Sequence, residues 1–426
     1  MGRRRIKAGR GSTYDRSVPF AVIVTLTVIL AACALLLERE DGERAAAPLR
    51  PDPIERIIDR VERERGLPFT REPDPQEVTA DRAREEGIES LDEDYPPARR
   101  RADAELLVLL GLLPAGTDLG EAAASTYGEG VAGYYDPRSG RLRIVEGAQT
   151  ANRVLYEMTV AHELTHALED QRFGFDLERL ASGDDAALAY TALIEGTATA
   201  MMYRYVERRF GREETFGGLA ASAFQPTGNL PPFLMAQLLF PYTAGEAFIG
   251  RLLEVGRGRW TIVNAALRFR PPASTEQVMH PQAYLELDQP ERVSLRGPVE
   301  TLGGGWRRLR AGTLGEWLTG RLLARAGGTS SADAAAGWGG DRYALLSRGD
   351  ERAIVARWRW DTRADVDEFV AALRAWGDEG LPDSTPAGRD TWRTPSGAAA
   401  LHRAGGTVTL VLAPDAALAR VVARAH

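Results

Sequence analysis

The chain has almost no cysteine and almost no lysine. Among its 426 residues there is one cysteine, Cys33, which lies in an apolar segment, and one lysine, Lys7. A single cysteine excludes a disulfide framework and a cysteine-rich zinc cluster within the chain. Any metal bound by this chain must therefore be held by histidine and carboxylate side chains.

A basic stripe is also lacking. The formal charge is −7, spread over many arginines and carboxylates, and basic residues cluster only within the first 16 positions. Nucleic-acid binding needs clustered positive charge, so we expect no nucleic-acid partner. The hydrophobic fraction of 44% is sufficient for a proper core, and the length allows two domains or one large domain with appendages.

The N-terminus has the pattern of a membrane anchor. Residues 1–17 carry six basic side chains against Asp15 alone, and residues 18–37 are uncharged and largely apolar. Twenty residues in a helix span about 30 Å, the thickness of the hydrocarbon core of a bilayer. Basic residues before this segment and acidic residues after it predict a single-pass protein of the cell membrane, with a cytoplasmic N-terminus and an extracytoplasmic remainder.

Cys33 leaves one alternative open. The stretch LAAC, residues 30–33, resembles a bacterial lipoprotein box, in which Cys33 would carry a lipid after cleavage. The apolar run continues through residues 34–37, where lipoproteins usually turn polar, so the transmembrane helix is favoured. Both interpretations place the rest of the chain outside the cytoplasm and attached to a membrane.

Residues 38–100 are charged and punctuated by proline. Within them Ile54, Ile57, Ile58 and Val61 recur at helical spacing. This pattern predicts a stalk with one or two amphipathic helices, or a pro-segment that docks over a cleft. Whether the segment inhibits the rest of the chain stays open.

A strand pair is expected to lead directly into a core helix. Residues 130–147 contain a turn at 136–140 and an alternating return strand, which predicts a β-hairpin. Residues 151–171 place apolar side chains three and four positions apart, the spacing of a buried helix. A second apolar helix is predicted from about Ala186 to Arg208.

The remainder is predicted to be helical at first and then mixed. Helices are expected between Leu234 and Phe269, with breaks at Pro241, Gly245 and Gly256. From about residue 335 a small α+β domain is expected. Its predicted elements are a hairpin around 348–350, a helix begun by Thr362 or Asp365, and two strands within 399–414.

Two of the five histidines, His162 and His166, lie four positions apart, with Glu163 beside the first. On a helix, positions i and i+4 share a face, so both imidazoles can bind one ion, while Glu163 is offset and can hold a metal-bound water. This is the pattern H-E-x-x-H in the helical context that it requires. We predict His162 and His166 as zinc ligands and Glu163 as general base; the alternative is an ordinary helix that carries two histidines.

A catalytic zinc needs a third protein ligand. Glu195 is the only charged residue between Asp185 and Arg204, in a segment that is apolar on most sides. A lone buried carboxylate is costly unless it is paired or bound to a metal. We therefore predict Glu195 as the third zinc ligand. The alternative is an ion pair with a buried arginine.

The stretch VAHELTHALEDQ followed by ALIEGTATAMMY resembles the gluzincin class of zinc peptidases, the thermolysin-like and aminopeptidase-like enzymes. In that class two histidines of H-E-x-x-H and a glutamate from the next helix bind zinc. More broadly, HELTHALEDQ, STEQVMHP and GWGGDRY are together similar to a group of membrane-anchored bacterial proteins described as metallopeptidases. The likeness to the gluzincins covers residues 130–210.

There are departures from the gluzincin pattern. Glu195 follows His166 by 29 positions, a longer gap than in thermolysin-like enzymes, so the connection must form an extra loop. Where those enzymes carry an aspartate that orients a zinc histidine, this chain has Thr199. Either the Thr199 hydroxyl or Asp170 is a candidate for orienting a histidine here.

The resemblance implies an α+β fold: a mainly helical zincin-like catalytic domain with a small β-sheet, one N-terminal transmembrane helix and a smaller C-terminal α+β domain. In chain order, we expect a basic cytoplasmic tail at 1–17, a transmembrane helix at 18–37, a charged stalk or pro-segment at 38–100, a metallopeptidase domain at 101–295, and a helical connector with an α+β domain at 296–426.

The resemblance further implies a membrane-anchored, extracytoplasmic zinc endopeptidase acting on a peptide or protein. The substrate would lie along a sheet edge, with 131–137 or the adjoining strand as the candidate, and His280, Tyr203 and Tyr284 are candidate oxyanion donors. Two alternatives remain open. One is an inactive zinc-binding module for binding or assembly in the cell envelope, and the other is a hydrolase of cell-wall peptide.

Overall fold

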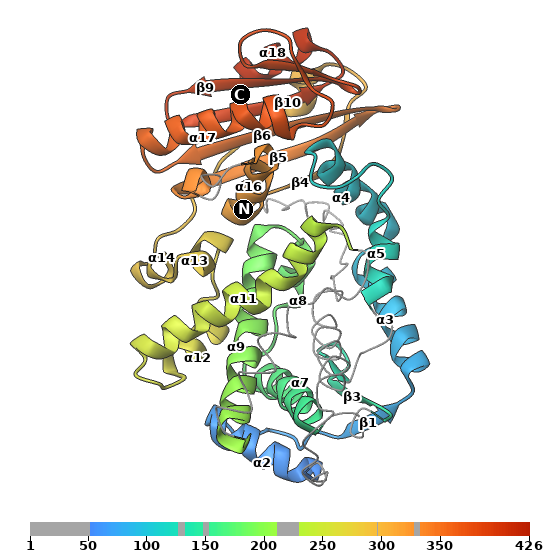
Figure 1. Ribbon diagram of the computed structural model, residues 1–426, viewed down its shortest axis with the longest axis vertical. Coiled ribbons are helices and arrows are strands. Elements are labelled where there is room, and N and C mark those ends of the chain that lie inside the picture. The colour runs from blue at the N-terminus through green and yellow to red at the C-terminus, as the bar shows by residue number, and fades with distance from the viewer. Residues whose placement is uncertain (1–51, 127–132, 148–152, 211–229, 296, 328–332) are drawn as a thin grey trace, which may run out of the picture.

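The computed structural model describes residues 52–126, 133–147, 153–210, 230–295, 297–327 and 333–426 (Figure 1). The predicted cytoplasmic tail, the predicted transmembrane helix and Cys33 lie outside these ranges. Within them, no helix combines the length and the apolar character that crossing a membrane requires.

The fold is α+β and contains two sheets. A three-stranded sheet has the order β1-β3-β2, and a seven-stranded sheet has the order β4-β5-β6-β10-β9-β8-β7. The strands are β1 Pro75–Val78, β2 Gly133–Asp136, β3 Arg141–Val145, β4 Arg307–Gly312, β5 Trp338–Arg348, β6 Glu351–Trp360, β7 Thr385–Pro386, β8 Thr391–Thr394, β9 Gly397–Ala404 and β10 Thr407–Ala413.

Helices form most of the body below the large sheet in Figure 1. They are α2 Ile54–Arg65, α3 Ala80–Asp94, α4 Pro97–Leu109, α5 Leu119–Thr126, α7 Arg153–Phe173, α8 Leu177–Ser182, α9 Asp185–Phe210, α11 Pro232–Val255, α12 Thr261–Arg268, α13 Thr275–Met279, α14 Pro281–Glu286, α15 Pro298–Leu302, α16 Gly315–Leu323, α17 Arg363–Ala375 and α18 Ala416–Ala425.

The predicted hairpin and the two helices after it are confirmed. Strands β2 and β3 pair antiparallel, and α7 follows them with Met158, Leu164 and Leu168 fully buried. Helix α9 then packs against α7 and, on another side, against α11. The burial of α9 is nearly continuous from Ala189 to Met202, as its apolar sequence requires.

The described part of residues 38–100 contains the predicted helices, as α2 and α3, but it packs into the fold and does not form a separate stalk. Ile57 and Val61 of α2 are completely buried against the helical body. Strand β1 joins the small sheet by pairing in parallel with β3. The segment is therefore an integral part of the fold, because its apolar residues are buried against the rest of the chain.

Two of the three expected breaks between Leu234 and Phe269 are wrong. Helix α11 continues through Pro241 and Gly245 and ends only at Gly256. Pro241 and Gly245 are both buried in the packing of α11. Tertiary contacts have overridden the local preference of proline and glycine to end a helix.

The C-terminal elements are confirmed, but their sheet begins earlier than expected. Strands β5, β6, β9 and β10 pair as predicted, and Thr362 and Asp365 together form a capping box at the start of α17. Strand β4 pairs with β5 and thereby adds 307–312 to the sheet, ahead of the boundary expected near residue 335. This strand contains three arginines, so its sequence does not show the alternation of apolar and polar residues that predicts a strand.

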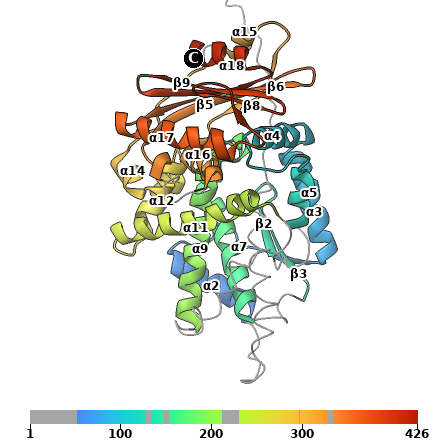
Figure 2. The same ribbon diagram turned by 45° about the horizontal axis from the view of Figure 1, so that its top comes forward.

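The seven-stranded sheet is covered on both faces (Figure 2). Helices α16 and α17 lie on the face toward the helical body, where Leu345 and Ile354 join the main core. Helices α15 and α18 lie on the outer face, over Leu346 and Val355. The main core therefore runs without interruption from the helical body into the C-terminal part of the chain.

Candidate metal centre

Helices α7 and α9 bring three predicted metal ligands together. The two Nε2 atoms of His162 and His166 lie 3.0 Å apart. Oε2 of Glu195 lies 3.2 Å from the first and 3.4 Å from the second. All three side chains are fully buried, and they are the one group of this kind among the described residues with the spacing to hold a metal ion.

The spacing fits a tetrahedral zinc ion. Ligands about 2.0–2.1 Å from zinc at tetrahedral angles lie roughly 3.3 Å from one another. The distances in the cluster, 3.0 to 3.4 Å, bracket that value. Two imidazoles and one carboxylate aimed at one point also form the His₂Glu set that catalytic zinc sites use.

The alternative for Glu195, an ion pair with a buried arginine, does not occur. Its ion-pair partners within the described chain are the two histidines. Burial alone would raise the pKa of Glu195, but His166 and His162 outweigh it and lower that pKa. The carboxylate is thus ionised and faces the imidazoles.

The two histidines differ in their affinity for a proton. Burial lowers the pKa of His162 to about 4. Burial also opposes protonation of His166, but the Glu195 carboxylate outweighs it and raises the pKa of His166 to about 9. The metal-free cluster therefore holds a proton at His166, which balances the charge of Glu195 and which a metal ion would displace.

Glu163 is held at one oxygen and free at the other. The backbone N–H of Tyr135 in β2 donates to Oε2 of Glu163 at 2.9 Å. Oε1 is buried and has no hydrogen-bond partner among the residues that the structure describes. Burial raises the pKa of Glu163 to about 8, which is within the range suited to a group that accepts and returns protons near neutral pH.

Neither residue expected to orient a zinc histidine does so. The Thr199 hydroxyl is buried, and no described residue forms a hydrogen bond with it. Asp170 instead accepts from the Tyr135 hydroxyl at 2.7 Å and from the Phe175 amide at 2.8 Å. Nδ1 of His162 and Nδ1 of His166 likewise have no hydrogen-bond partner within the described chain. The polar contacts of the two rings are those of their Nε2 atoms.

The candidate oxyanion donors lie elsewhere. His280 pairs with Glu316, with Nε2 and Oε1 2.8 Å apart, and the Tyr284 hydroxyl donates to the carbonyl of Arg270 at 2.9 Å. Within the part of the chain that the structure describes, these contacts join His280 to α16 and Tyr284 to the segment before α13, and not to the cluster on α7 and α9. Tyr203 is 37% exposed on the surface of α9. The structure does not bring these three residues to the metal site.

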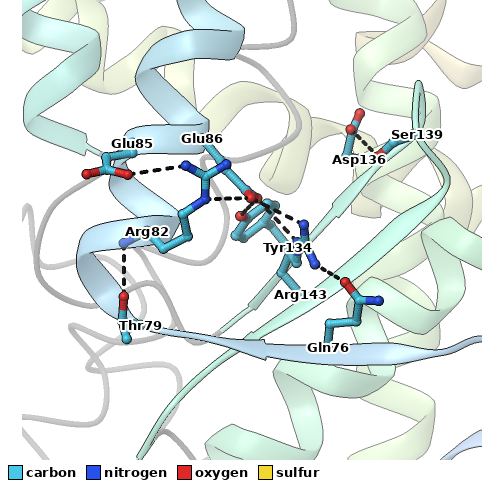
Figure 3. Close-up of polar contacts among 9 residues, drawn as sticks. All are labelled: Gln76, Thr79, Arg82, Glu85, Glu86, Tyr134, Asp136, Ser139 and Arg143. Carbon is cyan, nitrogen blue, oxygen red and sulfur yellow. Dashed lines mark hydrogen bonds and ion pairs between the residues drawn. The ribbon is translucent and has the colours of Figure 1, made fainter.

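Strand β2 is fixed beside the site by a polar network that the sequence did not predict (Figure 3). The Tyr134 hydroxyl donates to Glu86 of α3, and Arg143 of β3 donates to both oxygens of Glu86 at 3.2 Å. Arg143 also donates to Gln76 of β1. No sequence motif marks these residues, because Glu86 and Gln76 lie in a segment that resembles a solvated stalk.

Comparison with known proteins concerns only the C-terminal part. A family described as a domain of unknown function, DUF8575, matches residues 301–423. This is less than a third of the chain and does not include the metal cluster. No curated protein and no solved structure matches the chain.

Proposed function

We propose that this chain is a membrane-anchored, extracytoplasmic zinc metallopeptidase of the gluzincin type. The proposal is supported by the ligand atoms of His162, His166 and Glu195, which lie within 3.4 Å of one another. Glu163, with its unbonded Oε1, lies on α7 together with the two histidines. The anchor rests on the sequence of residues 18–37 alone.

The chemistry assigns one task to each residue. His162, His166 and Glu195 would hold the zinc ion, which would supply a Lewis acid and lower the pKa of a water toward about 7. Glu163 takes the proton from the attacking water and passes it to the leaving amine. The Tyr135 amide fixes Oε2 of Glu163, so that Oε1 remains available for the proton.

The small sheet offers a place for an extended peptide. In the order β1-β3-β2, strand β2 is an edge, and Tyr135 connects it directly to Glu163. A peptide that pairs with an edge strand satisfies its own backbone groups, and it would then lie beside the proposed general base. Figure 3 shows the contacts that hold these strands, from Tyr134 of β2 to Glu86 of α3 and from Arg143 of β3 to Glu86 and to Gln76 of β1.

One observation favours a second candidate function. The side chains of His162, His166 and Glu195 are 0% exposed and that of Glu163 is 1% exposed. A metal enclosed to this degree is also what a structural site has. The second candidate is therefore a catalytically inactive zinc-binding module that serves binding or assembly in the cell envelope.

Peptide hydrolysis by the zinc-loaded protein separates the two candidates. Glu163→Gln retains shape and hydrogen bonding but cannot accept the proton, so kcat should fall at least about 100-fold while zinc stays bound. Glu178→Gln, on the exposed surface of α8, is the control and should retain full activity. The substrates are a broad peptide library, unfolded proteins and solubilised cell-wall peptide.

Each outcome assigns the protein to one candidate. Hydrolysis that is lost in Glu163→Gln and retained in Glu178→Gln supports the peptidase. Stoichiometric zinc without hydrolysis of any substrate supports the inactive module. Hydrolysis that persists in Glu163→Gln contradicts the proposed role of Glu163.

A further inference from the structure

A group of arginines lies where α11 ends and α12 begins. Residues 251–270 contain five arginines and one carboxylate, Glu254, although the whole chain has a formal charge of −7. The proposed peptidase chemistry assigns this region no role. Five of its exposed side chains, which we call the basic surface, are Val255, Arg257, Arg259, Arg268 and Phe269.

The arginines of the basic surface have no carboxylate partner. Arg257, Arg259 and Arg268 are exposed and form no ion pair with any residue that the structure describes. The one carboxylate of the region is already engaged, because Oε2 of Glu254 lies 2.7 Å from Nη1 of Arg251. The basic surface therefore carries positive charge that no ion pair within the described chain balances.

Helix α12 lies between the two ends of the basic surface. Its exposed residues Thr261, Ala265 and Arg268 follow helical spacing and so share one face. The helix has eight residues and is about 12 Å long. Arg257 and Arg259 precede this face and Arg268 ends it, so positive charge flanks the face on both sides.

Two apolar side chains are exposed beside the arginines. Phe269 is 79% exposed, the largest value among the exposed large hydrophobic side chains that the structure describes, and Val255 is 43% exposed. Cations and apolar side chains in this combination are typical of surfaces that bind anionic bilayers. The cations contact lipid phosphates, and the apolar side chains enter the boundary between head groups and acyl chains.

The basic surface lies near the point where the described chain begins. Nε1 of Trp260, the residue before α12, donates to the carbonyl of Glu64 at the end of α2 at 2.8 Å. Asp52 precedes the other end of α2, which is about 18 Å away. The 14 residues 38–51 reach at most about 50 Å, so the predicted anchor at 18–37 would keep this end near a bilayer. The seven-stranded sheet lies at the opposite end of the molecule from α2 (Figure 1).

We propose that the basic surface docks on a bilayer that contains anionic lipids. Its three arginines bind lipid phosphates, and its two apolar side chains enter the head-group boundary. An acidic protein would also match the charge, but the predicted anchor brings a bilayer to this end of the chain. The position of the bilayer rests on the anchor in the proposed function, whereas the contact itself does not.

Docking would also set the distance between the bilayer and α9. Arg204 of α9 donates to the carbonyl of Gly258, between the arginines of the basic surface, at 3.1 Å. Glu195 precedes Arg204 by nine positions on the same helix, a rise of about 14 Å. The proposed metal centre would thus lie close to the bilayer surface.

Quenching of a fluorescent label on α12 by lipid tests the proposal in the full chain. Cys33→Ser removes the one cysteine, so Ala265→Cys then provides a single thiol on the exposed face of α12. The chain is placed in nanodiscs of equal parts phosphatidylcholine and phosphatidylglycerol, with a nitroxide on the lipid head groups. The label should be quenched at least about threefold more strongly than one on Val421→Cys of α18, where Val421 is 61% exposed.

Charge reversal identifies the cause of the contact. Arg257→Glu with Arg259→Glu should lower the quenching on α12 to the level on α18, and so should nanodiscs of phosphatidylcholine alone. Arg420→Glu with Arg424→Glu, at exposed positions of α18, changes the net charge by the same amount and should leave the quenching unchanged. Circular dichroism shows whether both double variants fold.

Equal quenching on α12 and α18 in the mixed lipid overturns the proposal, as does quenching that Arg257→Glu with Arg259→Glu leaves unchanged. Self-association that these substitutions abolish, without lipid contact, assigns the basic surface to a second copy of the chain instead. Flotation with vesicles separates these results from a failure of the anchor. A chain without an anchor would float with the mixed vesicles and not with phosphatidylcholine alone, and only while Arg257 and Arg259 are present.

Discussion

Gly196 and Gly245 lie in backbone contact where α9 crosses α11. A Cβ atom added to Gly196 would be 2.3 Å from the carbonyl carbon of Gly245, and one added to Gly245 would be 2.2 Å from the carbonyl oxygen of Ala192. No side chain fits at either position. The contact fixes α9 at the residue that follows the proposed ligand Glu195.

Gly245→Ala should therefore destabilise the protein, and Gly250→Ala should not. Overpacking of a close helix contact costs about 1–3 kcal/mol or more. Gly250 lies five positions further along α11, with nothing within 4 Å of an added Cβ, so alanine there should stabilise by about 0.5–1 kcal/mol. Urea denaturation measures both, and equal changes in the two variants would refute the contact.

Arg65 and Glu169 form a fully buried ion pair, with Nε and Oε1 2.7 Å apart, that joins α2 to α7. Removal of one partner leaves an unpaired buried charge, so Arg65→Met should cost about 3–5 kcal/mol. The double variant Arg65→Met with Glu169→Gln should recover much of that loss in the same denaturation assay.

The control for this pair is Arg251→Met. Arg251 forms an exposed pair with Glu254, and such pairs contribute about 0–1 kcal/mol. If the double variant is less stable than Arg65→Met alone, the loss comes from packing, including the contact of Arg65 over the Trp260 ring, rather than from the unpaired charge of Glu169.

Glu276 should make stability fall as pH rises from about 4.5 to about 8. Burial, together with the nearby carboxylates of Glu316 and Asp361, raises its pKa to about 8. Since the folded pKa lies above the unfolded value near 4.5, the stabilisation is complete below pH 4.5 and is lost as pH rises through 8. Glu276→Gln should thus gain about 2 kcal/mol over the wild type between pH 5 and pH 9, allowing for solvent screening.

Thermal or urea denaturation across that pH range measures the difference. Glu286→Gln, at an exposed position of α14, serves as the control and should follow the wild type at every pH. A stability difference between Glu276→Gln and the wild type that does not change with pH would show that Glu276 does not titrate with a raised pKa.

Zinc binding should release protons. His166 carries a proton in the metal-free chain below about pH 9, because Glu195 raises its pKa, and a ligand must be deprotonated. Apparent zinc affinity should therefore rise about tenfold per pH unit between pH 6 and 8 for each proton released. Calorimetry in buffers of different ionisation enthalpy counts the protons. A zinc affinity that does not depend on pH would contradict the proton at His166.

The parts of the fold that were predictable depend on local spacing. The i, i+4 histidines need only the periodicity of one helix to share a face, and the isolation of Glu195 among apolar residues indicated its burial directly. The hairpins and the capping box at Thr362 are local in the same sense. Geometry of this kind is encoded within a few consecutive residues.

The parts that were missed depend on contacts between distant segments. Arg65 and Glu169 are 104 positions apart, and nothing near either residue indicates its partner. Gly245 was predicted to break the helix because glycine has a low helix propensity. Its close contact with α9 depends on the tertiary fold, which local propensity does not describe. The partners of Asp170 were missed for the same reason, since Tyr135 and Phe175 reach it through the fold.

The central claim is that His162, His166 and Glu195 hold one zinc ion, and the zinc content of the purified chain tests it most directly. Elemental analysis after equilibration with zinc and removal of the unbound metal should find one zinc per chain in the wild type and in Glu178→Gln. Glu195→Gln keeps the shape of the side chain but removes the charged ligand and should lose most of the zinc. Equal zinc in Glu195→Gln and the wild type, or no zinc in either, would contradict the account.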